Sequence, residues 1–181
     1  LLNDLFGIQA RGGCSCAGPY GHRLLGIDLE RSHAFQREIS KGCEGLKPGW
    51  TRLNINYFLS DATCDYLIDA VHLLADEGWK LLPDYTFAPQ TGLWHHRDAP
   101  LDPPLRLSAV QYDGDGTMQY PHSHLSADES AYPDYLERAR TLLSARPAVP
   151  CWDEQEPVGL SAGFEALRWF PLPSVCLRSA D

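Results

Sequence analysis

The sequence lacks any apolar run close to the roughly 18 residues that a membrane-spanning helix needs. Basic side chains are also scarce in its second part, because residues 61–181 carry eight Lys or Arg against nineteen Asp or Glu. Nucleic acids and anionic membranes both require a basic face, so this composition argues against either partner. Residues 1–60 are slightly basic, with seven Lys or Arg against five Asp or Glu, which suits an anionic substrate.

Composition also argues against a disordered chain and against a disulfide-dependent one. Hydrophobic residues make up 44% of the 181 residues and charged residues 22%, as in an ordinary globular protein. Six cysteines would allow three disulfides, but a chain of this length with an ordinary core does not depend on them. We therefore expect reduced thiols and a cytoplasmic location. The cysteines are Cys14, Cys16, Cys43, Cys64, Cys151 and Cys176.

A glycine-rich turn near the N-terminus carries two of these thiols. Arg11 precedes two glycines and then Cys14 and Cys16, after the apolar segment 5–10, which we predict to be a short buried strand. The glycines allow positive φ angles and leave room for a substrate. The Arg11 guanidinium favours a nearby thiolate and can hold a carboxylate by two parallel hydrogen bonds. Local chemistry alone favours unreactive cysteines packed beside the turn, because buried cysteine is common.

Hydrophobic periodicity predicts a strand and then a helix after this turn. Residues 50–58 alternate apolar and polar side chains, which predicts a strand whose polar face carries Arg52 and Asn54. Ser60 or Asp61 then caps an amphipathic helix that ends at Gly78. Its predicted core positions recur at helical spacing and are Cys64, Leu67, Ile68, Val71, Leu74 and Ala75.

The remaining patterns complete an α+β fold. We predict a small, mainly antiparallel sheet with helices packed on one face, followed by a proline- and aromatic-rich C-terminal extension. The expected division is a domain over residues 1–94 and the extension over residues 95–181. Further predicted elements are helices over 19–25, 29–41 and 128–145, a hairpin over 105–120 with its turn at 113–116, and a docked apolar tail after residue 147.

Two blocks of the sequence carry a family pattern. The first is Gly7-Ile8-x-x-Arg11-x-Gly13-x-x-Cys16-Ala17-x-Pro19. It resembles the catalytic-cysteine loop of cysteine desulfurases and selenocysteine lyases, which belong to the class V aminotransferase family. The second block, residues 49–58, resembles the family's strand whose arginine binds the substrate carboxylate, and Arg52 stands at that position. The resemblance covers about residues 1–80 and includes the helix after the second block.

The resemblance implies a pyridoxal phosphate (PLP) enzyme of fold type I that works as a homodimer, with residues 1–94 as its C-terminal small domain. Arg52, together with Arg11, would hold the carboxylate of an amino-acid substrate. PLP would serve as the electron sink. Cys16, as a thiolate, would take the substrate's sulfur as a persulfide and release alanine, and a sulfur-acceptor protein is a further possible partner.

The family's PLP lysine lies in a large domain that precedes this region. The chain has only Lys41, Lys47 and Lys80, and none stands in a setting that resembles the family's Schiff-base lysine. The sequence also opens at Leu1 in a helical pattern. We therefore expect the C-terminal part of a longer enzyme, inactive alone because the PLP-lysine domain is absent.

One departure from the family pattern keeps alternatives open. Many relatives have histidines before the cysteine, whereas this chain has Cys14-Ser15, so either thiol could react and sulfur chemistry could have been lost. One alternative is an aminotransferase or lyase without sulfur chemistry. Another is a non-enzymatic interaction or regulatory module that binds a partner through its acidic, aromatic tail. A redox or metal-binding Cys-x-Cys site ranks last.

Histidines and one acidic turn give no strong metal pattern. The pairs His95-His96 and His122-x-His124 lack the spacing of zinc sites. The Asp-Gly-Asp-Gly turn at 113–116 lacks the remaining ligands of a calcium loop. We assign no metal ligand. His22, six residues after Cys16, is either an acid or base near the thiol or a solvent-facing helix residue.

Overall fold

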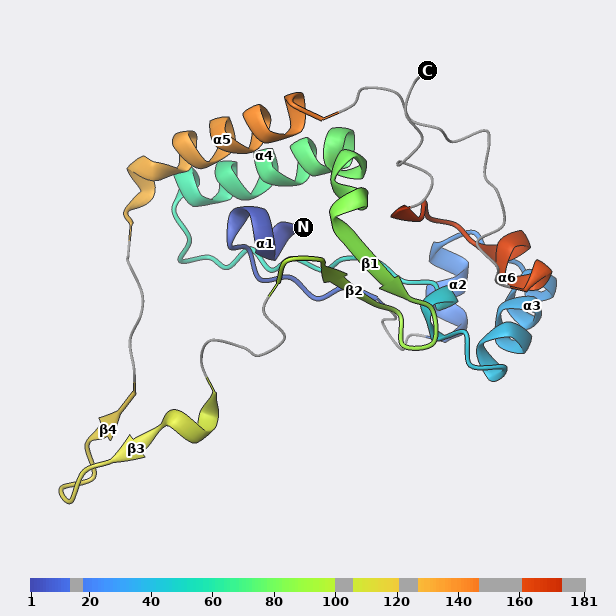
Figure 1. The fold of residues 1–181 in the computed structure, drawn as a ribbon, viewed down its shortest axis with the longest axis horizontal. Coiled ribbons are helices and arrows are strands. Elements are labelled where there is room, and N and C mark those ends of the chain that lie inside the picture. The colour runs from blue at the N-terminus through green and yellow to red at the C-terminus, as the bar shows by residue number, and fades with distance from the viewer. Residues whose placement is uncertain (14–17, 100–105, 121–126, 147–160, 174–181) are drawn as a thin grey trace.

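The computed structural model describes residues 1–13, 18–99, 106–120, 127–146 and 161–173. Within these ranges the chain combines helices with antiparallel strands, so the α+β class is confirmed (Figure 1). The α-helices are α1 Leu2–Phe6, α2 Pro19–Leu24, α3 Leu29–Ser40, α4 Asp61–Glu77, α5 Tyr132–Ser144 and α6 Ala162–Leu167. Short 3₁₀ turns cover Glu44–Leu46, Gly78–Asp84, Leu107–Ala109 and Glu129–Ala131. The strands are β1 Tyr85–Ala88, β2 Leu93–His96, β3 Gln111–Tyr112 and β4 Met118–Gln119.

The four strands form two separate hairpins. β1 pairs with β2, and β3 pairs with β4, in both cases antiparallel. The first hairpin lies against the body of the molecule, whereas the second projects away from it (Figure 1). β3 and β4 flank the turn at 113–116, as the sequence predicts, although the strands are shorter than expected.

α4 and α5 lie side by side, with α1 next to α4 (Figure 1). The Tyr66 hydroxyl donates to the backbone carbonyl of Phe6 at 2.9 Å, which ties α4 to α1. Its ring stacks on that of Tyr132, with ring centroids 4.3 Å apart. The buried members of this cluster are Phe6, Ile8, Tyr66, Ala70, Leu136 and Ala139.

A second cluster joins α3 to the C-terminal segment, which confirms that residues 161–173 dock on the rest of the chain. Its buried members are Phe35, Leu46, Phe164 and Leu167. At its edge the carboxylate of Glu38, which is only 6% exposed, accepts hydrogen bonds from Lys41 at 2.6 Å and Ser161 at 2.9 Å. These donors lower the pKa of Glu38, the bond from Lys41 more than that from Ser161.

A third cluster packs β1 against the ends of α4 and α5. Leu81, Tyr85 and Leu143 are its buried members. The Tyr85 hydroxyl donates to Asp4 at 2.7 Å. Burial and this bond raise the pKa of Tyr85 well above its usual value, and the bond lowers the pKa of Asp4. The hairpin is thereby fixed to α1.

The predicted cap of α4 at Ser60 is confirmed, and Asp28 caps α3 in the same way. Asp28 accepts the backbone N–H of Arg31 at 2.7 Å and begins α3. Ser60 accepts the N–H of Thr63 at 3.0 Å and begins α4. A side-chain oxygen at the N-cap satisfies a backbone donor that has no partner inside the helix.

α4 buries a different stripe from the one that its periodicity predicts. Tyr66 and Ala70 are its buried residues. Ile68, Val71 and Ala75, all predicted to be in the core, are exposed. The prediction is wrong for these three because α4 is apolar around more than half of its circumference, and the position of α5 decides which part is covered.

Only Trp50 and Arg52 of the expected strand at 50–58 bond through their backbone to another segment. Arg52 forms an isolated antiparallel bridge with Arg11. Beyond it, Tyr57 is 99% exposed and Phe58 is 70% exposed. A regular strand was therefore a wrong prediction, because alternation produces one only where a neighbouring strand and a covered face are available. Beyond Arg52 the described residues supply no pairing strand, and Leu53 is the last residue before position 59 that is not exposed.

No helix in the described ranges is both long enough and apolar enough to cross a membrane.

Candidate functional site

Arg11 and Arg52 lie directly opposite each other in a short two-stranded ribbon. The N–H of Arg52 donates to the carbonyl of Arg11 at 2.8 Å, and the N–H of Arg11 donates back at 3.2 Å. A third bond, from the N–H of Trp50 to the carbonyl of Gly13 at 3.2 Å, continues the pairing toward the glycine turn. Residues that exchange both bonds project their side chains to the same face of the ribbon. The two predicted carboxylate-binding arginines are therefore neighbours.

The first half of this ribbon is positioned by the end of α1. Gly7 ends the helix at φ +67°, a left-handed conformation that glycine adopts without strain. Ile8 follows and is buried in the α1–α4–α5 cluster. The chain then reaches Arg11 without forming a regular strand, so the predicted buried strand over residues 5–10 is wrong: its first two residues belong to α1, and residues 7–10 belong to no helix or strand. Leu53 packs against the same cluster and holds the opposite half.

Successive side chains of an extended backbone point in opposite directions, so the ribbon has two faces. One face carries Arg11 and Arg52 and borders a cavity of about 420 Å³. Asn54 lines the same cavity, together with the apolar residues Ile8, Ala10, Leu53 and Leu67. Gln9 also lines it, and the sequence analysis missed this residue. Its position two residues before Arg11 was the available signal, since side chains two apart in an extended chain share a face.

The electrostatics of this face favour an anion. No carboxylate in the described part of the chain forms an ion pair with Arg11 or Arg52. Like charges placed directly opposite each other in a ribbon destabilise it. A bound anion would remove this cost, and a carboxylate matches the fork of guanidinium donors. The amides of Gln9 and Asn54 add neutral donors and acceptors beside the charges.

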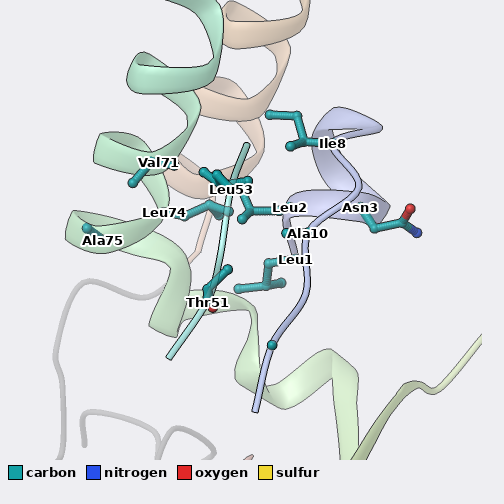
Figure 2. Close-up of a pocket in the computed structure, with 11 residues that line it drawn as sticks. Leu1, Leu2, Asn3, Ile8, Ala10, Thr51, Leu53, Val71, Leu74 and Ala75 are labelled. Carbon is teal, nitrogen blue, oxygen red and sulfur yellow. The ribbon is translucent and has the colours of Figure 1, made fainter. Parts of the chain in front are cut away.

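The other face of the ribbon borders a larger and more apolar cavity of about 580 Å³ (Figure 2). The side chains of Leu2, Leu53 and Leu74 converge there from α1, the ribbon and α4, while Asn3 points away. This cavity contains no titratable side chain. It is an open apolar groove whose lining includes the exposed side chains of Leu1 and Val71, and the charged groups of the ribbon do not line it.

The two thiols predicted to be reactive, Cys14 and Cys16, both lie outside the described residues. The structure therefore defines no distance between them and the arginine pair. Cys43 and Cys64 are described as free and partly buried. His22 forms a hydrogen bond through Nδ1 to the Ser32 hydroxyl at 2.8 Å, in a partly buried contact between α2 and α3. That contact gives His22 a structural role.

The lysines and the potential metal ligands show no cofactor site. Lys41, Lys47 and Lys80 each pair with a glutamate three residues earlier in the chain. His96 packs edge-on against Tyr85 within the first hairpin, with ring centroids 5.2 Å apart. The described ranges hold no group of three His, Cys, Asp or Glu side chains placed to bind a metal ion. His122 and His124 lie outside these ranges.

Comparison of the chain with protein-family models, with curated proteins and with solved structures gives no match. The functional interpretation therefore rests on the residues themselves and on the geometry of the arginine pair.

Proposed function

We propose that the chain is the C-terminal part of a PLP-dependent enzyme of the class V aminotransferase type, most like a cysteine desulfurase, and that its arginine pair binds the substrate carboxylate. Residues 1–94 would form the C-terminal small domain of fold type I, and residues 95–181 an extension of unknown role. The full enzyme would be a cytoplasmic homodimer. The free thiols of Cys43 and Cys64 support a reducing compartment.

The backbone pairing of Arg11 with Arg52 is the observation that carries this proposal. It brings together two cations with no described carboxylate partner, beside a cavity of about 420 Å³. A free amino acid has a carboxylate that two such guanidiniums can hold by parallel hydrogen bonds. The same ribbon leads through Gly13 to Cys14 and Cys16 in the sequence, which ties the carboxylate site to the proposed nucleophile.

The described residues do not fit a PLP site of their own. A Schiff-base lysine needs a free amine, whereas each lysine here is held in an ion pair with a glutamate. The cofactor would therefore be held by protein outside these 181 residues. What this chain supplies is recognition of the carboxylate and a thiol.

Cys16 would act as the nucleophile. Its thiolate would form a sulfur–sulfur bond with the substrate cysteine while the substrate's carbon–sulfur bond breaks. The electron pair of that bond would stay with the carbon, which takes up a proton, so a persulfide is left on the enzyme and alanine is released. Arg11, five residues earlier, would favour the thiolate over the thiol. A sulfur-acceptor protein would then remove the persulfide.

A second candidate function is an interaction module without enzymatic activity. Tyr57 and Phe58 are exposed next to the ribbon, and large exposed aromatic side chains in one segment are typical of protein-binding surfaces. In this case the arginine pair would bind an acidic side chain or a C-terminal carboxylate of the partner.

One experiment separates these proposals. The full-length protein that contains this chain would be purified, its absorption spectrum recorded for PLP, and sulfide and alanine assayed after addition of cysteine. PLP together with sulfide release that disappears in Cys16→Ala supports the desulfurase. PLP without sulfide release supports an aminotransferase or lyase, and absence of PLP supports the interaction module.

A further inference from the structure

A small cavity of about 200 Å³ lies away from the arginine pair, between four segments of the chain. Its walls come from the turn after α2, from α3, from the loop at 48–49 and from the C-terminal segment. The residues that matter for its chemistry are Arg31, Phe35, Pro48 and Trp169. None of the proposed roles above uses these residues.

The Phe35 wall of this cavity is fixed in place, whereas the Trp169 wall is 51% exposed and is held at one edge. Phe35 is 2% exposed and forms part of the α3–α6 core. The indole N–H of Trp169 donates to the carbonyl of Leu46 at 3.4 Å, and its ring packs edge-on against Phe170 with centroids 5.4 Å apart. Because the Phe35 ring is already held, a ligand would not have to order it, and a preformed wall costs less binding free energy.

Arg31 supplies an available positive charge at the same cavity. Its guanidinium carbon lies 5.9 Å from the centroid of the Phe35 ring. Arg140, Arg146 and Arg168 all form ion pairs with carboxylates, whereas no described carboxylate forms one with Arg31. An exposed guanidinium over an aromatic ring, with no anion bound to it, is a site where a carboxylate can add two charge-assisted hydrogen bonds.

We propose that this cavity binds a small aromatic carboxylate. The ring of the ligand would lie between Phe35 and Trp169, and its carboxylate would pair with Arg31. The size fits one ring, since a cavity of about 150 Å³ is known to hold benzene. Nucleotides and other drug-sized ligands need roughly 300 Å³ or more and are excluded.

The cavity is connected through the backbone to the glycine turn. Its wall at Pro48 and Gly49 continues directly into Trp50, whose N–H bonds to Gly13 in the glycine turn. A ligand packed against this wall restricts the base of that turn. The binding site itself is independent of the proposed PLP chemistry.

The test is a titration of the isotope-labelled chain with benzoate, followed by NMR. The signal to follow is that of the Trp169 indole N–H, which is identified by its absence from the spectrum of Trp169→Phe. The expected result is a saturable shift that benzamide and acetate do not reproduce, since the first lacks the charge and the second the ring. Arg31→Gln should weaken benzoate binding by about tenfold or more, the loss expected for a charge-assisted bond of about 1.5–3 kcal/mol.

Arg37→Gln is the matched control, because Arg37 is an exposed arginine on the same helix that does not line the cavity. It should bind benzoate like the wild type. The proposal is overturned if benzoate produces no saturable shift, if benzamide binds equally well, or if Arg31→Gln binds as the wild type does. Loss of PLP chemistry would leave each of these results unchanged.

Discussion

Arg11 and Arg52 face each other across a single antiparallel bridge, joined by two backbone hydrogen bonds of 2.8 and 3.2 Å. A third bond, from the N–H of Trp50 to the carbonyl of Gly13 at 3.2 Å, joins the same two segments. The bridge places two guanidiniums on one face of a narrow ribbon, where their repulsion is relieved by an anion.

Removing one guanidinium should weaken substrate binding without abolishing the reaction. Arg52→Gln and Arg11→Gln in the full-length enzyme should each raise KM for the amino-acid substrate by about tenfold or more, because a hydrogen bond to a charged group contributes about 1.5–3 kcal/mol. Steady-state kinetics check this. Arg138→Gln, on the exposed face of α5, is the control and should leave KM unchanged.

The two thiols of the glycine turn should differ in function. Cys16→Ala should abolish sulfide release from cysteine, whereas Cys14→Ser should retain it, because only Cys16 matches the position of the persulfide-forming residue. Mass spectrometry of the enzyme after one turnover should find the added sulfur on Cys16. An added sulfur on Cys14, or equal loss of activity in both variants, would contradict this assignment.

A methyl group at Gly45 should destabilise the protein. Gly45 donates its N–H to the carbonyl of Pro89 at 2.8 Å, and an added Cβ would overlap the ring of Phe87. That ring is packed against Trp94, so Gly45→Ala should cost about 1–3 kcal/mol of unfolding free energy, as overpacking does. Chemical denaturation measures it. Gly114→Ala is the control, because open space surrounds Gly114.

The contact between α3 and α6 should weaken in acid. Hydrogen bonds from Lys41 and Ser161 lower the pKa of Glu38 below 4.5. A carboxylate with a lowered pKa stabilises the fold at pH values above its ordinary pKa, and this stabilisation is lost as the pH falls through the lowered value. The Tm of the wild type should therefore exceed that of Glu38→Gln near neutral pH. The difference should shrink once the pH falls below about 4.

Local signals made the helices predictable. The caps Asp28 and Ser60 satisfy the first backbone donors of α3 and α4 through residues only three positions away, so no distant contact is needed to place these starts. The turn at 113–116 is local in the same way. The predicted helix over 128–145 was found as α5 for the same reason, with Asp128 accepting the N–H of Ser130 before it.

Distant contacts decided the features that sequence did not predict. Which stripe of α4 is covered depends on where α5 packs, and this left Ile68 and Val71 exposed. Whether the segment around Tyr57 becomes a strand depends on a partner that the alternation of side chains does not specify. In the candidate site, the orientation of Arg52 followed from its own segment. Its pairing with Arg11 required two segments far apart in the chain to meet.

The central claim is that the arginine pair binds a substrate carboxylate. Comparing kcat/KM for cysteine with kcat/KM for its methyl ester tests this claim most directly. In the full-length enzyme, kcat/KM should be much higher for cysteine than for the ester in the wild type, because the ester lacks the charge. The double variant Arg11→Gln/Arg52→Gln should lose most of this preference while its activity on the ester is kept. A double variant that still prefers cysteine to the same degree as the wild type would contradict the account.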